Sequence, residues 1–304
     1  MHKHEISQAH ELTNHFVSST GAHIFYRDFQ PSRPNGLVPL MCLHGFLRNS
    51  RDFSEVGELL ASQGVRVIIP DLRGRGFSQR FADPANYHYD LVKRDVAELI
   101  SHLKLNRLAV LGTALGAFIG MDLVVELNGS IGGLILNDQG AEVNTQSANK
   151  MASSVEQSDY SFDEAVMRMK TQFGQAHPGL SHERWVNLMH RAYREVSPGR
   201  YARDLDLATL SDVPRMKAER FDLWPFFLAT KQIPVSILRG ELSEYFSEDC
   251  AIRMTERHKN AVLTTVKDRG HPLLLDEPES LPAILDLLKR ASPKPYTLSI
   301  DGTS

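Results

Sequence analysis

The chain has 304 residues, of which 42% are hydrophobic and 23% are charged, and its formal net charge is −3. This length suits an α/β core with an insertion, and the composition is that of an ordinary globular protein. The sequence contains no basic run and no apolar stretch long enough to span a bilayer. We therefore expect neither nucleic acid nor a membrane as a partner.

The N-terminal segment and the cysteine content bear on the compartment. Polar residues are scattered through the first twenty residues, so we expect no secretory signal. The chain has two cysteines, which argues against a disulfide framework and favours the cytoplasm. Four histidines near the N-terminus are irregularly spaced (His2, His4, His10 and His15), and we assign them no metal.

Up to residue 139, predicted strands alternate with predicted helices. The strands are apolar runs at 21–29, 37–43, 65–69, 108–111 and 133–136. The helices have apolar residues spaced three and four apart, at 53–62, 89–103 and 115–127. This alternation predicts βαβ units and a mostly parallel sheet covered on both faces.

The pattern changes between residues 140 and 230. Helical periodicity dominates there, at 162–173, 183–196 and 214–228, and no segment is a convincing strand. The α/β pattern then resumes with strands at 235–238 and 261–266 and a closing helix after Pro278. We predict a core formed by 1–139 and 231–304, with 140–230 inserted after the sixth strand as a helical lid.

The most informative stretch is 109–117, which reads Ala-Val-Leu-Gly-Thr-Ala-Leu-Gly-Ala. A strand-like run ends at one glycine, turns, meets a second glycine and continues as an apolar helix, which is the context of a nucleophile elbow. The residue at the apex is Ala114, which has no group that could attack a substrate. Thr113 is a poor substitute, because centring the pattern there puts leucines where small residues are required.

Several further motifs occur in a definite order along the chain. They are His44-Gly45, the segment 71–78 (Asp-Leu-Arg-Gly-Arg-Gly-Phe-Ser), the elbow and Arg269-Gly270-His271. With them, residues 21–290 resemble the α/β-hydrolase superfamily, and 44–53 and 222–225 resemble its branch of lidded esterases, enol-lactonases and carbon–carbon-bond hydrolases. The resemblance implies an α/β-hydrolase fold, with a mostly parallel, twisted eight-stranded sheet, a lid and no cofactor or metal.

A hydrolase of this type needs a nucleophile, an acid and a base in that chain order. His271 lies in the loop after the last predicted strand and is the predicted base. Glu244 follows the seventh strand and is the predicted acid. Glu241 is its alternative, and Asp138, after the sixth strand, is a more distant one.

Other residues are predicted to bind the substrate. Backbone N–H groups of Phe46 and Leu115 are expected to form the oxyanion hole, next to the His44-Gly45 turn. Arg48, Asn49 and Arg51 follow this turn and are candidates to bind a substrate carboxylate. Trp224, Phe226 and Phe227 are candidates for the wall of an apolar pocket, although packing within the lid explains them equally well. We expect a small apolar carbonyl substrate, and lidded hydrolases of this kind often form homodimers.

Ala114 leaves three functional interpretations open. The first is a serine-type hydrolase of an ester, lactone or carbon–carbon bond whose nucleophile is replaced by alanine, so that this form is inactive. The second is an enzyme without a serine that uses His271 as a general base for lyase or cofactor-free chemistry. The third is a ligand-binding protein that catalyses nothing. The intact base, acid and oxyanion positions favour the first, because they would be expected to drift once catalysis was lost.

Overall fold

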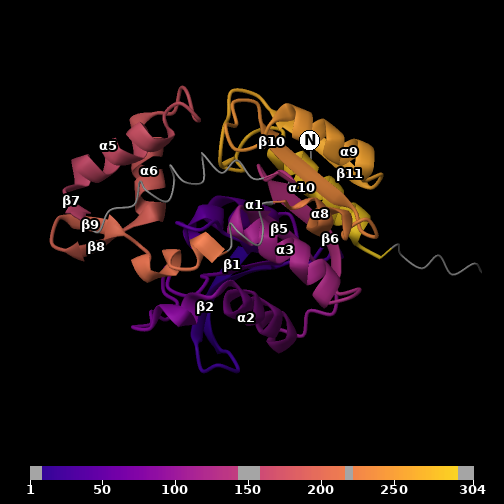
Figure 1. Cartoon of the computed structure of the whole chain (residues 1–304), viewed down its shortest axis with the longest axis horizontal. Coiled ribbons are helices and arrows are strands. Elements are labelled where there is room, and N and C mark those ends of the chain that lie inside the picture. Colours follow the sequence, from indigo (N-terminus) through magenta and orange to yellow (C-terminus); the bar gives the residue numbers. More distant parts are fainter. Residues whose placement is uncertain (1–8, 143–157, 216–221, 294–304) are drawn as a thin grey trace, which may run out of the picture.

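The computed structural model describes residues 9–142, 158–215 and 222–293, and an eight-stranded sheet lies at its centre (Figure 1). In spatial order the strands are β1 (Ala9–Val17), β2 (His23–Pro31), β4 (Val67–Pro70), β3 (Leu40–Leu43), β5 (Leu108–Thr113), β6 (Ile131–Asn137), β10 (Val235–Gly240) and β11 (Ala261–Val266). The pairs β1–β2 and β2–β4 are antiparallel, and the other neighbouring pairs are parallel. The predicted sheet is therefore confirmed. Its first strand, β1, is one that the sequence pattern did not locate.

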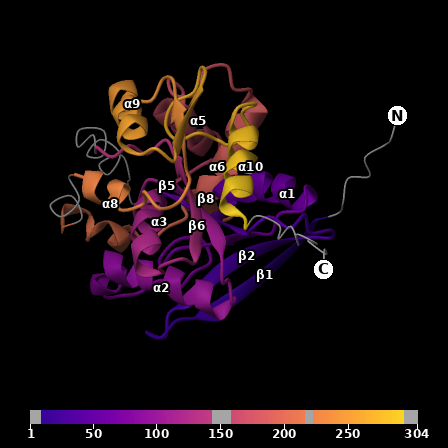
Figure 2. The same cartoon turned by 90° about the vertical axis from the view of Figure 1, so that its right-hand side faces the viewer.

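Helices cover both faces of the sheet, as Figure 2 shows. On one face lie α1 (Ser54–Ser62) and α10 (Ser280–Ala291), and on the other α2 (Tyr89–His102), α3 (Leu115–Glu126) and α9 (Glu248–Arg257). Successive side chains of β3 illustrate the two layers, because Met41 and Leu43 join one core cluster while Leu40 and Cys42 join the other. A strand that is buried on both sides has to be apolar throughout, which explains the continuous apolar runs in the sequence.

The lid between β6 and β10 contains both helices and strands. Its elements are β7 (Asp159–Tyr160), α5 (Phe162–Phe173), α6 (His182–Ala192), β8 (Tyr193–Ser197), β9 (Arg200–Arg203), the 3-10 helix η3 (Leu207–Leu210) and α8 (Trp224–Leu228). α5 has the predicted bounds, and it begins with a capping box between Ser161 and Glu164. The side chains of α5, α6 and β8 form a small apolar core of their own.

Two expectations for the lid were wrong. The segment expected to be a helix up to residue 196 leaves the helix after Ala192 and continues as β8, which pairs with β9 in an antiparallel sheet in the order β7-β9-β8. The segment 214–228 is not one helix, because Asp222 forms a β-bridge with Glu142 before α8 begins. Residues 216–221 of that segment lie outside the described residues.

Ion pairs fasten the lid to the core. Arg184 and Arg191 of α6 both pair with Glu55 of α1, and Arg184 also pairs with Asp276. Asp204, just after β9, accepts Arg51 from the 3-10 helix η1 (Ser50–Phe53). None of the helices in the described part of the chain is both long enough and apolar enough to cross a membrane.

Candidate active site

The predicted elbow is present between β5 and α3, and Ala114 occupies its apex. The backbone of Ala114 has φ 46° and ψ −109°, a conformation that residues with a side chain rarely adopt. A Cβ on Gly112 would lie 2.4 Å from the N atom of Ala117, and one on Gly116 would lie 1.9 Å from the carbonyl oxygen of Leu43. Both glycines are therefore required by close backbone packing.

Thr113 does not replace the missing nucleophile. Its side chain is buried, and its Oγ1 accepts a hydrogen bond of 3.0 Å from the Asn137 side chain. The same Asn137 amide donates to the carbonyl of Leu273, two residues beyond His271. Asn137 thus connects the end of β5 to the loop that carries the predicted base.

The carboxylate that contacts His271 belongs to Asp138. Asp138 Oδ2 lies 3.0 Å from His271 Nδ1, and the Asp138 side chain is completely buried. Two donors from the turn after β10 hold this carboxylate, the Gly240 N–H at 2.9 Å and the Ser243 hydroxyl at 2.6 Å. The ring of Tyr245 packs on the imidazole, with centroids 4.3 Å apart. His271 is therefore oriented by a carboxylate at the end of β6.

The structure pairs His271 with neither Glu244, the predicted acid, nor its alternative, Glu241. Glu244 is exposed in the turn after β10, and Glu241 accepts a hydrogen bond from the backbone of Asp268. Asp138, which had been the most distant candidate, makes the contact instead. The reason is local. The Ser243 hydroxyl in that turn donates to the Asp138 carboxylate and helps to hold it beside the imidazole.

The predicted oxyanion loop lies beside the elbow. A Cβ on Gly45 would lie 3.8 Å from the Cβ of Ala114. His44 donates from Nδ1 to the Gly45 carbonyl and accepts the Leu72 N–H at Nε2. Burial lowers the pKa of His44 to about 3, so this side chain is neutral and structural at neutral pH.

Two backbone donors remain available at this position. Arg75 donates to the carbonyl of Phe46 at 3.0 Å and fixes the loop. Within the described residues, neither the Phe46 N–H nor the Leu115 N–H has an acceptor. Leu115 is the first residue of α3, where a helix leaves its N–H groups unpaired and favours negative charge. This geometry is compatible with the predicted oxyanion hole.

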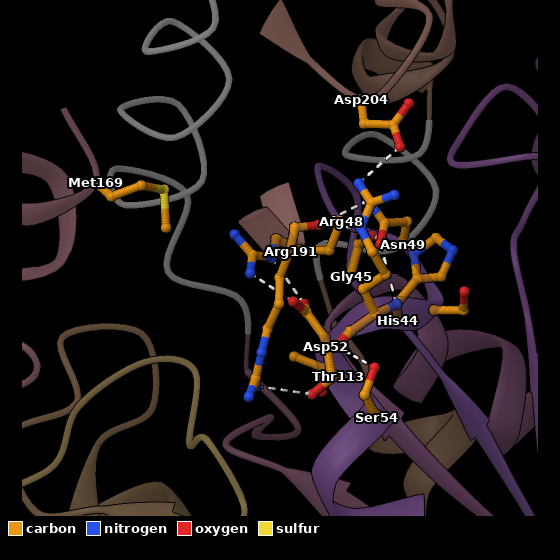
Figure 3. Close-up of polar contacts among 12 residues, drawn as sticks. His44, Gly45, Arg48, Asn49, Asp52, Ser54, Thr113, Met169, Arg191 and Asp204 are labelled. Atoms are coloured by element: carbon orange, nitrogen blue, oxygen red, sulfur yellow. Dashed lines mark hydrogen bonds and ion pairs between the residues drawn. The ribbon is translucent and has the colours of Figure 1, made fainter. Parts of the chain in front are cut away.

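The polar residues after this loop connect it to the lid (Figure 3). Arg48 forms a bidentate ion pair with Asp52, and Arg51 pairs with Asp204 at 2.7 Å. Asn49 donates to the backbone carbonyl of Arg191 at 2.9 Å. Their expected role in binding a substrate carboxylate is not supported, because protein groups already use these side chains.

His177 in the lid is a residue that the sequence analysis did not identify. It is buried, and its Nδ1 has no hydrogen-bond partner within the described residues. Its neighbours on both sides contact the loop of the predicted base, since the Ala176 carbonyl accepts the Gly270 N–H and the Pro178 carbonyl accepts Arg269. Burial, helped by the charges of Arg269, His271 and Arg48, lowers the pKa of His177 to about 4.

The aromatic candidates of the lid have mainly packing roles. Trp224 donates to Glu142 at 3.0 Å and lies under the guanidinium of Arg257. Phe227 is completely buried and packs on Trp224 and the ring of His258, so it does not wall a pocket. Phe226 is half-buried against the same core. In the described part of the chain, no cluster of three His, Cys, Asp or Glu side chains could hold a metal ion.

Comparison with known proteins agrees with the fold. Residues 38–278 match the family model described as alpha/beta hydrolase fold. The chain belongs to this family. It is 28% identical over 276 residues to a 3-hydroxybutyrate-oligomer hydrolase from Cupriavidus necator, covering 86% of this chain and 91% of that protein.

Solved structures give the same result. An alpha/beta hydrolase from Novosphingobium aromaticivorans is 30% identical and superposes with a TM-score of 0.84, covering 93% of this chain and 99% of the other. A putative hydrolase from Rickettsia typhi is 22% identical, with a TM-score of 0.77 and the same coverage, and supports the fold alone.

Proposed function

We propose that this site binds a small carboxylic ester and is built for acyl transfer, with Ala114 standing where the nucleophile would be. The observation that carries the proposal is the buried Asp138–His271 pair beside the elbow. Thr113 and Asn137 are paired positions on β5 and β6, so Ala114 and Asp138 follow them at the same edge of the sheet. An acid, a base and an elbow in this arrangement are the parts of a serine-type hydrolase.

The backbone of Ala114 supports the same proposal. Holding a non-glycine residue at such φ and ψ angles costs about 1–3 kcal/mol. In a serine-type hydrolase, this strained turn places the nucleophile at the apex within reach of both the base and the oxyanion donors. For an alanine, the same conformation has no catalytic use. The site therefore retains the geometry of covalent catalysis without its reacting atom.

With a serine at position 114, each remaining group has a role. The serine oxygen attacks the ester carbonyl while His271 takes its proton, and Asp138 stabilises the imidazolium that forms. The Phe46 and Leu115 N–H groups stabilise the oxyanion, and water then releases the acyl group. With Ala114 the first step is missing, so we expect the present form to bind its ligand and leave it unreacted.

One relative supports a proposal for the substrate class. The name of the C. necator protein specifies oligomers of 3-hydroxybutyrate, and the similarity extends over most of both chains. Such oligomers are linear esters of a hydroxy acid. We therefore propose an ester of a small hydroxy acid as the substrate, in preference to a carbon–carbon bond.

The Ala114→Ser variant tests the proposal with neutral p-nitrophenyl acetate and butyrate. We expect a gain of about 10³-fold or more over the unaltered protein, since loss of a triad nucleophile costs several orders of magnitude. A pre-steady-state burst and an acyl adduct on the introduced serine, found by mass spectrometry, would show the covalent route. Ala114→Gly, which supplies no nucleophile, is the matched control.

A folded Ala114→Ser variant without any gain would reject acyl transfer. His271-dependent turnover of a non-ester substrate would then favour general-base chemistry, and binding without turnover would favour a ligand-binding protein.

A further inference from the structure

Arg203, the last residue of β9, is a buried cation that forms no ion pair with any of the described residues. Its side chain is 8% exposed. Nη2 donates to the Gln172 side chain at 2.7 Å, Nη1 faces the sulfur of Met169 at 3.9 Å, and the guanidinium lies over the ring of Tyr193. None of these partners is negatively charged, and no carboxylate among the described residues pairs with Arg203.

The other arginines of this region differ from Arg203 in this respect. Five of them have a carboxylate partner, in the pairs Arg48–Asp52, Arg51–Asp204, Arg184–Glu55, Arg191–Glu55 and Arg200–Asp159. Buried Arg75 has none, but two backbone carbonyls hold its guanidinium. Arg203 has one oxygen acceptor, although a guanidinium carries five N–H donors.

A buried, unpaired charge is unfavourable unless something compensates it. Burial lowers the pKa of Arg203 to about 10, which still leaves the guanidinium charged at neutral pH. An apolar side chain beside Met169 and Tyr193 would avoid this cost. A cation in this position is therefore better explained by an anion that it binds.

The position of Arg203 connects it to the candidate active site. The next residue, Asp204, accepts the Gly76 N–H, and Leu205 forms a β-bridge with Arg75. Arg75 in turn holds the carbonyl of Phe46 in the oxyanion loop. The charges of Arg48 and Asp52, which follow the oxyanion loop, act on the guanidinium of Arg203. The charge of Arg203 thus lies on the lid side of the oxyanion loop.

We propose that Arg203 binds a carboxylate of the ligand, so that the preferred ligand is an ester with a free carboxylate at one end. A planar guanidinium suits this group because it can donate two parallel hydrogen bonds to a carboxylate. The subsite rests on the proposed ester pocket, because the carboxylate is the terminal group of the same ligand. A linear hydroxy-acid oligoester has an ester carbonyl for the elbow and a carboxylate for the lid.

The unaltered protein can be used for the test, since Ala114 leaves the ligand unreacted under the proposed function. Isothermal titration calorimetry would compare the linear dimer of 3-hydroxybutyrate as the free acid with its methyl ester. We expect the free acid to bind at least about tenfold more tightly, as a charge-assisted hydrogen-bond pair implies. Arg203→Met should bind the two probes with equal affinity, and Arg203→Lys should keep part of the preference.

Arg200→Met is the matched control, because Arg200 lies on the same strand but its side chain is 43% exposed and paired with Asp159. It should keep the full preference for the free acid. Thermal melting of each variant checks the fold, and Arg203→Met should melt no lower than the unaltered protein because it removes an unpaired buried charge.

Equal affinity of the unaltered protein for both probes would overturn the subsite, and so would a preference that survives in Arg203→Met. Absence of binding by either probe would overturn it as well. Acyl transfer is judged separately, because the p-nitrophenyl esters used with Ala114→Ser carry no carboxylate.

Discussion

Replacing Asp138 with asparagine tests whether the pair seen in the structure supports catalysis. The Ala114→Ser variant supplies the activity in which the change is measured. Asparagine has the shape of aspartate, and its oxygen can still accept the Gly240 N–H that binds Oδ1 at 2.9 Å. The substitution removes the negative charge 3.0 Å from Nδ1 of His271 and puts an amide N–H donor in place of the Oδ2 acceptor.

The size of the effect can be worked from that distance. Two unit charges at 3.0 Å attract each other by about 5 kcal/mol at an effective dielectric constant of about 20. The attraction develops only when His271 becomes an imidazolium, so it lowers the barrier and not the ground state. Since each 1.4 kcal/mol is about a factor of ten in rate, we expect kcat/KM to fall by about 10³ to 10⁴.

The assay is hydrolysis of p-nitrophenyl butyrate by Ala114→Ser with and without Asp138→Asn. Glu244→Gln in the same background is the control, because Glu244 is the acid that the sequence motif predicts and is exposed in the structure. We expect this control to keep its rate within about twofold, as for other exposed substitutions. More than a tenth of the activity left in Asp138→Asn, at an unchanged melting temperature, would refute the assignment, as would a large loss in Glu244→Gln.

Two further predictions concern stability. Gly116→Ala should cost more than about 3 kcal/mol in chemical denaturation, because its Cβ would lie 1.9 Å from the Leu43 carbonyl oxygen. Gly129 has φ 86° and nothing within 4 Å of an added Cβ, so Gly129→Ala should cost only about 1 kcal/mol. An equal loss of unfolding free energy in the two variants would contradict the packing argument. Hydrogen bonding by Arg184 lowers the pKa of Glu55 from its ordinary 4.5 to about 2. The stability that this contact between lid and core contributes is therefore fully present above pH 4.5 and is lost as the pH falls toward 2. Glu55→Gln should therefore show a smaller drop in melting temperature over that range, and an identical drop would reject the contribution.

The sheet and the elbow were predictable because short-range patterns determine them. Runs such as 108–111 are apolar throughout, which indicates a strand buried on both faces. Around Ala114, the spacing of two glycines specifies a turn whose packing tolerates no Cβ, and the structure shows contacts of 2.4 and 1.9 Å at these positions. His271 was predicted as the base from its place in the motif order and not from its own surroundings.

The lid shows where such patterns fail. α5 was predicted with correct bounds, since its capping residues and apolar spacing lie within the helix itself. β8 was predicted as a helix, because its neighbour in the sheet, β9, is brought to it only by the turn at Gly199, where φ is 71°. Strand formation depends on such a partner more than on intrinsic preference, so the local sequence could not reveal it.

The carboxylate that contacts His271 was not predicted, for a different physical reason. Asp138 and Glu244 follow β6 and β10, which are neighbouring parallel strands, so the ends of both strands reach the same edge of the sheet. Which carboxylate turns toward His271 depends on the donors that hydrogen-bond to it when it is buried, since a buried polar group without hydrogen bonds is costly. The Gly240 N–H and the Ser243 hydroxyl provide them to Asp138, whose backbone has φ 50°. The Ser243 hydroxyl, in the turn after β10, thus helps to hold the carboxylate from the end of β6 beside His271. Sequence motifs alone could not predict this contact, because it depends on the pairing of the two strands.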